Sequence, residues 1–168
     1  MNDIQQSLKQ LDHIIKQEIQ AYQQLSECLD TEKQLLVKRQ LKHFVNNLYQ
    51  KEMLTGKIAR LEQTRQRLTT SLASCFHLPN PDLTLRRLST LTQAPYANRF
   101  ADYRTQLKIL LNRLQKQNQE NERLLTASLT IVNEALAFFA SLGVATPTYC
   151  SSGDFSSQAQ GRLLSQRV

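Results

Sequence analysis

The side chains that commonly do chemistry in proteins are few in this sequence, and they are not grouped. Three histidines and three cysteines are spread along the chain: His13, His43, His77, Cys28, Cys75 and Cys150. None of them has a second ligand at the spacing that a metal site uses, and the cysteines form no CxxC pair. The sequence also lacks a Glu-x-x-His pair, a glycine-rich phosphate loop and a serine nucleophile elbow. We therefore predict no enzymatic site, no metal, no cofactor and no small-molecule substrate.

The chain is clearly basic, which raises the question of an anionic partner. Its formal net charge is +7, and residues 39–77 carry seven basic and two acidic residues. The arginines that would best suit nucleic acid lie in and after this stretch: Arg60, Arg65, Arg67, Arg86 and Arg87. No aromatic residues are interleaved with them for base stacking, and no helix-turn-helix signature accompanies them. A solvated helix face is therefore favoured over a nucleic-acid surface.

The same composition indicates a cytoplasmic protein. No positively charged segment leads into an apolar run near Met1, so we expect no signal peptide. The longest apolar run, residues 135–142, is far shorter than the roughly 18 residues of a transmembrane helix. We therefore expect no membrane-spanning helix. Scattered cysteines in odd number suit a reducing compartment.

Apolar residues at heptad spacing predict that long helices make up the first half of the chain. The first row contains Ile4, Leu8, Leu11, Ile15, Tyr22, Leu25 and Leu29, and Glu18 interrupts it once. We predict one helix at about residues 2–37 and a second at about 40–76. No glycine or proline separates them, but the apolar row changes phase near residues 37–40. One straight rod could not bury its own apolar row, so we expect the chain to fold back there.

The second half of the chain is predicted to hold one short and one long helix. Pro79 and Pro81 end the second helix, and Asp82 is a suitable N-cap for a short helix at about 82–92. A long helix then follows at about 98–142, with Gly143 just past its end. Its apolar seam contains Tyr103, Leu107, Leu110, Leu114, Leu124, Ile131, Ala135, Phe138 and Leu142. Polar residues fill the remaining seam positions, where they are better suited to setting register than to binding: Gln117, Asn121 and Ser128.

These elements predict an all-α fold, namely a bundle of long antiparallel helices with coiled-coil-like packing at residues 1–143. Residues 144–168 are rich in small polar residues without a sustained period, which predicts a mobile C-terminal tail. The tail nevertheless contains four large apolar side chains: Tyr149, Phe155, Leu163 and Leu164. Such residues either pack onto the bundle or become buried when a partner binds, and the sequence leaves both possibilities open.

Two segments of the chain carry motifs that are typical of one protein family. The long helix contains Asn118-Gln-Glu-Asn-Glu-Arg-Leu-Leu125, followed by Ser128-Leu-Thr-Ile-Val132. The tail adds Thr148-Tyr149, Gly153 and Gly161-Arg-Leu-Leu164. Together these segments resemble the FlgN family of flagellar export chaperones, whose tail has a similar Tyr-Gly and Gly pattern. Cys150 departs from that pattern, because a glycine usually follows the tyrosine. The positive net charge is also unexpected for such a chaperone.

The resemblance implies a cytoplasmic chaperone that binds the C-terminal helices of hook-associated proteins, which form the hook–filament junction. It would keep these proteins from assembling early and deliver them to the type III export gate. Any contact with a membrane would then be indirect, through the export apparatus. We expect the client-binding surface to contain Ile131, Phe138, Phe139, Leu142, Leu163 and Leu164. Core packing within the bundle is the alternative for Ile131, Phe138 and Leu142. By the same resemblance Tyr149 would dock on the export gate, and its alternative is packing against the bundle.

Two other functions remain open from the sequence. One is a structural coiled-coil homodimer without a client, which would stay dimeric on dilution. The other is a basic helical protein that binds nucleic acid, with an affinity that falls steeply with salt.

Overall fold

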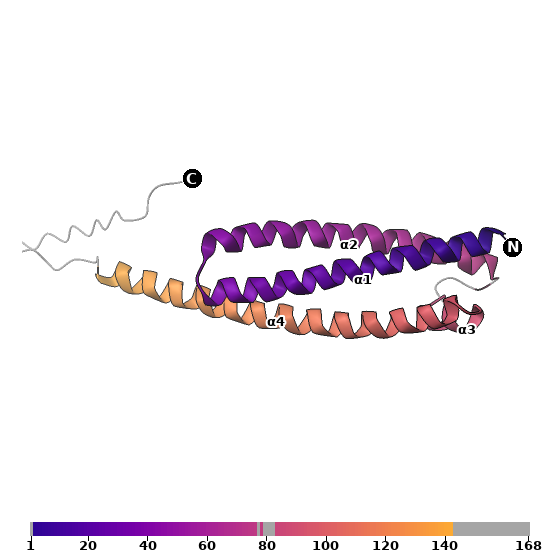
Figure 1. The fold of residues 1–168 in the computed structure, drawn as a ribbon. Helices are drawn as coiled ribbons and strands as arrows, with labels where there is room; N and C mark the ends of the chain where they lie inside the picture. The colour runs from indigo at the N-terminus through magenta and orange to yellow at the C-terminus, as the bar shows by residue number, and fades with distance from the viewer. Residues whose placement is uncertain (1, 77, 79–82, 143–168) are drawn as a thin grey trace, which may run out of the picture. The chain divides into compact units, whose positions relative to one another are not determined.

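The computed structural model describes residues 2–76, 78 and 83–142. Within them it contains four α-helices and no strand: α1 (Asn2–Val37), α2 (Leu41–Cys75), α3 (Leu85–Leu91) and α4 (Tyr96–Leu142) (Figure 1). The predicted all-α class is confirmed. The chain divides into two compact units, Met1–Leu124 and Leu125–Val168, so α4 begins in the first unit and ends in the second.

The first unit is built on a hairpin of α1 and α2, which pack along each other. The chain turns back at residues 38–40, where the phase of the apolar row changes, although neither glycine nor proline is present. Arg39 takes the left-handed backbone conformation, with φ of 54°. The Gln40 N–H donates to the Leu35 carbonyl at 3.0 Å, and the Arg39 N–H donates to that of Leu36 at 3.2 Å. This pair of bonds is the usual way to close a helix whose C′ residue is left-handed.

The beginning of α4 completes the first unit by lying alongside α1. The Tyr103 hydroxyl donates to Asp12 at 2.9 Å, and the Asn121 amide donates to the Leu29 carbonyl at 2.8 Å. Residue numbers rise together in these contacts, so this part of α4 runs parallel to α1 and antiparallel to α2 (Figure 1). The bundle is therefore antiparallel within the hairpin but parallel between α1 and α4, because α2 returns the chain to the starting end of α1 and α4 begins there.

Most of the predicted apolar row of α1 is buried in the core of the first unit. One cluster joins all four helices: Leu8, Leu11, Ile15, Ile19, Leu72, Ala73, Leu83, Leu88, Phe100 and Tyr103. A second cluster lies farther along α1: Ala21, Tyr22, Leu29, Ile58 and Leu114. Glu18 interrupts the apolar row in the sequence, yet it is also buried, with 1% of its surface exposed. Arg65 of α2 compensates its charge, since the guanidinium Nε lies 2.9 Å from both carboxylate oxygens.

The short helix starts later than the sequence predicted. We expected it at 82–92 with Asp82 as its N-cap, but α3 begins at Leu85, and Thr84 is the cap. The Thr84 hydroxyl accepts a hydrogen bond from the Arg87 N–H at 3.3 Å. Threonine is also a favoured N-cap residue, although aspartate ranks above it, so residue type alone did not identify the cap. The long helix begins at Tyr96, directly after Pro95, rather than at residue 98.

One segment of α4 is apolar on average although it contains no long uninterrupted apolar run. By length and composition, Tyr96–Ser141 contains an 18-residue window that could span a membrane, and none of that window is buried. The mean hydropathy of the window is high even though polar residues lie within it. The end of α4 has such residues on one face, including Thr130, Asn133 and Glu134. Polar residues on a lipid-facing surface are costly, so the segment is better described as amphipathic than as membrane-spanning.

Candidate interaction surface

A polar layer ends the buried part of α4. The Gln117 amide accepts from the Ser26 hydroxyl at 2.9 Å and donates to Asp30 at 2.6 Å. One turn later, the Asn121 amide donates to the Leu29 carbonyl and, at 3.2 Å, to Glu32. Gln117 and Asn121 thus lie in the seam between α1 and α4, as their heptad positions indicated. Polar pairs of this kind fix the register of two helices more than they stabilise them.

Glu32 links this polar layer to α2. Its carboxylate is buried, and the Lys51 ammonium of α2 lies 2.9 and 3.2 Å from its two oxygens. Asn121 of α4 donates to one of the same oxygens, so a single carboxylate connects α1, α2 and α4. The Asn121 side-chain oxygen is itself buried and has no hydrogen-bond partner in the described part of the chain. An unpaired buried acceptor costs free energy, so this layer is not optimised for stability.

Beyond this layer, α4 presents a row of large apolar side chains that nothing in the described structure covers. The row contains Leu125, Leu129, Val132, Leu136 and Phe139. Successive members are four, three, four and three residues apart, which places them on one side of the helix. Their exposed fractions run from 37% to 65%. Among the described residues, none after Asn121 is buried.

Three of the residues predicted for partner binding lie in or next to this row. Phe139 belongs to it, and Ile131 and Phe138 lie in the adjacent heptad row. Ile131 and Phe138 are each 59% exposed, and Phe139 is 65% exposed. The Phe138 and Phe139 rings lie edge to face, with centroids 5.9 Å apart. The alternative assignment of Ile131 and Phe138 to the bundle core is wrong for the described structure, because no other helix packs against them there. The side chain of Leu142, and the whole of Tyr149, Leu163 and Leu164, lie outside the described residues.

Four members of the exposed row were missed in the sequence: Leu125, Leu129, Val132 and Leu136. The signal was present, because each of these residues directly follows a seam position, at 124, 128, 131 and 135. Two adjacent heptad rows make an apolar face about twice as wide as one seam. A helix in a simple pair needs only one row, so the second row indicates a further partner.

No group of three or more His, Cys, Asp or Glu side chains among the described residues could hold a metal ion. Cys28 is buried, its thiol donates to the Asn47 side-chain oxygen at 3.4 Å, and burial raises its pKa above the ordinary value. The thiol therefore stays protonated and unreactive near neutral pH.

Comparisons with known proteins point to one family. A family model described as FlgN protein matches residues 1–156, which include all four helices. The search of curated proteins and the search of solved structures each found no match. The match covers the polar layer, the exposed row and the beginning of the segment after α4.

Proposed function

We propose, from the premise that the chain belongs to the FlgN family and is therefore a flagellar export chaperone, that its clients are hook-associated proteins. It binds their C-terminal helices in the cytoplasm and keeps these proteins from assembling before export. It then delivers them to the type III export gate. The coarse role comes from the family, whereas the client, the compartment and the delivery step are the proposal.

The observation that carries this proposal is the exposed apolar face of α4 at residues 125–141. An amphipathic client helix would otherwise expose its own apolar side, and the two faces bury each other when the helices pair. The row from Leu125 to Phe139, with Ile131 and Phe138 beside it, has the i, i+3, i+4 spacing that receives helical anchors. The face is too large for a helix that has no partner, so a client explains a feature that the bundle does not need.

Further residues enter the proposal through the family resemblance. Leu142, Leu163 and Leu164 extend the client-binding surface, and Tyr149 docks on the export gate. The segment after α4 adds affinity by ordering on the client, and the entropic cost of that ordering keeps the complex releasable.

Binding of a synthetic C-terminal helix of a hook-associated protein to the full chain tests the client surface. The double variant Leu136→Ser/Phe139→Ser removes two large side chains from the apolar face, where both are more than half exposed. We expect it to weaken binding by about tenfold or more, because each lost side chain removes roughly 1–2 kcal/mol of apolar burial. The melting temperature should not change.

The matched control is Thr130→Ser/Ala137→Ser, which introduces two serines on the polar face of the same helix, away from the apolar row. It should bind the client helix as the unaltered chain does. Equal weakening by both double variants would indicate damage to the helix and not loss of a surface. Binding unaffected by Leu136→Ser/Phe139→Ser would reject this face as the client site.

Capture of partners by the full chain and by a chain ending at Gly143 separates the functions that the sequence left open. Hook-associated proteins captured only by the full chain would place essential contacts after Gly143. Their capture by both chains would leave the site on the helices. Recovery of only a second copy, or only nucleic acid, would reject the proposed clients.

A further inference from the structure

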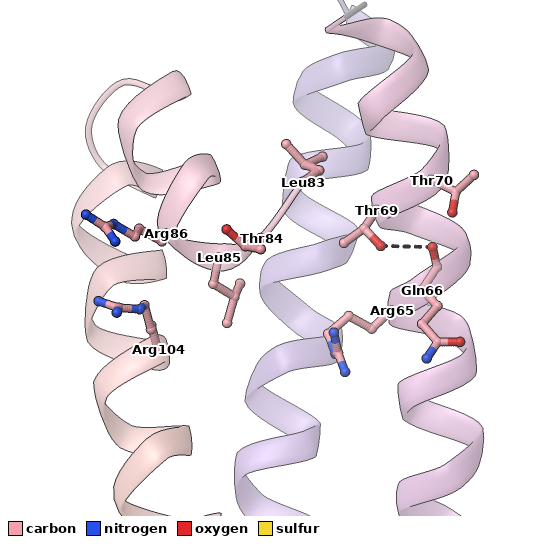
Figure 2. Close-up of a pocket in the computed structure, with 9 residues that line it drawn as sticks. All are labelled: Arg65, Gln66, Thr69, Thr70, Leu83, Thr84, Leu85, Arg86 and Arg104. Carbon is pink, nitrogen blue, oxygen red and sulfur yellow. Dashed lines mark hydrogen bonds between the residues drawn. The ribbon is translucent and has the colours of Figure 1, made fainter. Parts of the chain in front are cut away.

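A hollow of about 760 Å³ lies in the first unit, and no residue of the exposed row of α4 lines it (Figure 2). Residues of α2, of α3 and the segment before it, and of α4 line it: Arg65, Gln66, Thr69, Thr70, Leu83, Thr84, Leu85, Arg86 and Arg104. Three of the nine lining side chains are arginines, and no lining side chain is acidic. The hollow is within the usual size range of ligand-binding pockets.

Two of the arginines have charges that the described structure does not neutralise. Arg65 is paired with the buried Glu18, so its charge is already balanced. Arg86 of α3 and Arg104 of α4 are exposed and form no ion pair with any described residue. Figure 2 shows their guanidinium groups on the same side of the hollow. Two adjacent positive charges repel each other, and a shared anion would relieve that repulsion.

Two threonine hydroxyls of the hollow are already hydrogen-bonded within the chain. The Thr69 hydroxyl donates to the Gln66 carbonyl at 2.9 Å (Figure 2), and the Thr84 hydroxyl accepts from the Arg87 N–H. Leu85 is only partly buried and adds an apolar surface between the arginines and α2. The hollow therefore offers guanidinium donors beside an apolar patch. This combination suits a ligand with both carboxylate and apolar groups.

We propose that this hollow binds an acidic segment of a partner protein. Carboxylates of the segment bridge Arg86 and Arg104 by charge-assisted hydrogen bonds, and an apolar side chain packs on Leu85. A peptide suits the hollow better than nucleic acid does, because no aromatic side chain lines it for stacking bases. The site uses no residue of the exposed face of α4, so it stands independently of the proposed client binding. Binding of an acidic segment would also account for part of the positive net charge of the chain.

Fluorescence anisotropy with the full chain tests the proposal. The probe is a short labelled peptide of alternating Glu and Leu, and its control has Gln in place of each Glu. The variant Arg86→Gln/Arg104→Gln should weaken binding of the Glu peptide by about tenfold or more, because two charge-assisted contacts are lost. The matched variant Arg60→Gln/Arg67→Gln removes the same charge from exposed arginines outside the hollow. It should change the affinity by about twofold or less, as expected for screened surface charges.

A charge-reversed variant keeps the test decisive. Arg86→Glu/Arg104→Glu should lose the Glu peptide and instead bind a peptide of alternating Lys and Leu, which a merely unfolded chain would not do. Equal weakening by the two Gln variants, or equal affinity for the Glu and Gln peptides, would overturn the site. A labelled DNA duplex that binds more tightly than the Glu peptide, and depends on Arg86 and Arg104, would show that the occupant is nucleic acid and overturn the peptide assignment.

Discussion

At the scale of single residues, buried charges on α1 hold the first unit together. Glu18 lies within the apolar row, and its carboxylate is compensated by Arg65 of α2. Burial raises the pKa of Glu18 above its ordinary value, and the nearby guanidinium opposes that rise only in part. A buried ion pair of this kind is expensive to break, because one partner is left charged without compensation.

The variant Arg65→Gln therefore has a pH-dependent cost. Without Arg65 the pKa of Glu18 rises further, so the folded state binds a proton more tightly than the unfolded state does. The stability linked to this protonation is present below the ordinary pKa and is lost as pH rises through the folded value. We expect urea unfolding to show a loss of about 3 kcal/mol at pH 8 and a smaller loss at pH 5.

The double variant Glu18→Gln/Arg65→Gln is the control for this prediction. It removes both charges, so the pH-dependent part of the loss should disappear. An Arg65→Gln chain that is destabilised equally at both pH values would show that Glu18 does not depend on this guanidinium.

At the scale of one element, α4 is a continuous helix with two different environments. From Phe100 to Asn121 its inner side chains are buried against other helices, first in apolar contacts and then in the polar layer. From Leu125 onward its large apolar residues are exposed. Helices of modest length are marginal in water without packing, so the second part depends on a partner for its stability.

Hydrogen exchange of the full chain should reveal this difference. Amides at residues 125–141 are expected to exchange faster than those at 100–121. Local unfolding of 125–141 exposes little buried apolar surface and therefore costs less free energy. Addition of a client helix should slow exchange at 125–141 and leave 100–121 unchanged. Strong protection of 125–141 without a client would contradict the assignment of this face to client binding.

At the scale of the whole molecule, the buried residues and the exposed apolar face lie in different units. All the described buried residues fall between Leu8 and Asn121, within Met1–Leu124. The first unit therefore has what a folded domain needs, including both apolar clusters and the ion pairs between helices.

A chain ending at Leu124 tests this division. We expect it to unfold cooperatively in urea, with a midpoint close to that of the full chain, because truncation removes no described buried residue. It should no longer bind the client helix. A large fall in the midpoint, or loss of cooperativity, would show that residues after Leu124 are part of the folded core.

The heptad periodicity of the apolar residues predicted much of the architecture. The heptad rows of α1 and α4 identified Leu11, Ile15 and Tyr103 as core residues, and the phase change near residue 38 located the turn. The position of the cap at Thr84 could not be predicted, since several residue types are favoured as helix N-caps. The burial of Glu18 was not readable either, because its partner is 47 residues away and only folding brings them together.

By itself, then, the sequence determined that the chain is helical, where the helices run and which sides of them are apolar, because these properties depend on local spacing. Only the tertiary structure decided which apolar sides are covered. It buried the row of α1 and left the row from Leu125 to Phe139 exposed, although both have the same heptad pattern. It also brought Arg86 and Arg104 to one hollow from two helices. Burial and convergence depend on contacts between distant segments, and the spacing of residues along the chain does not contain them.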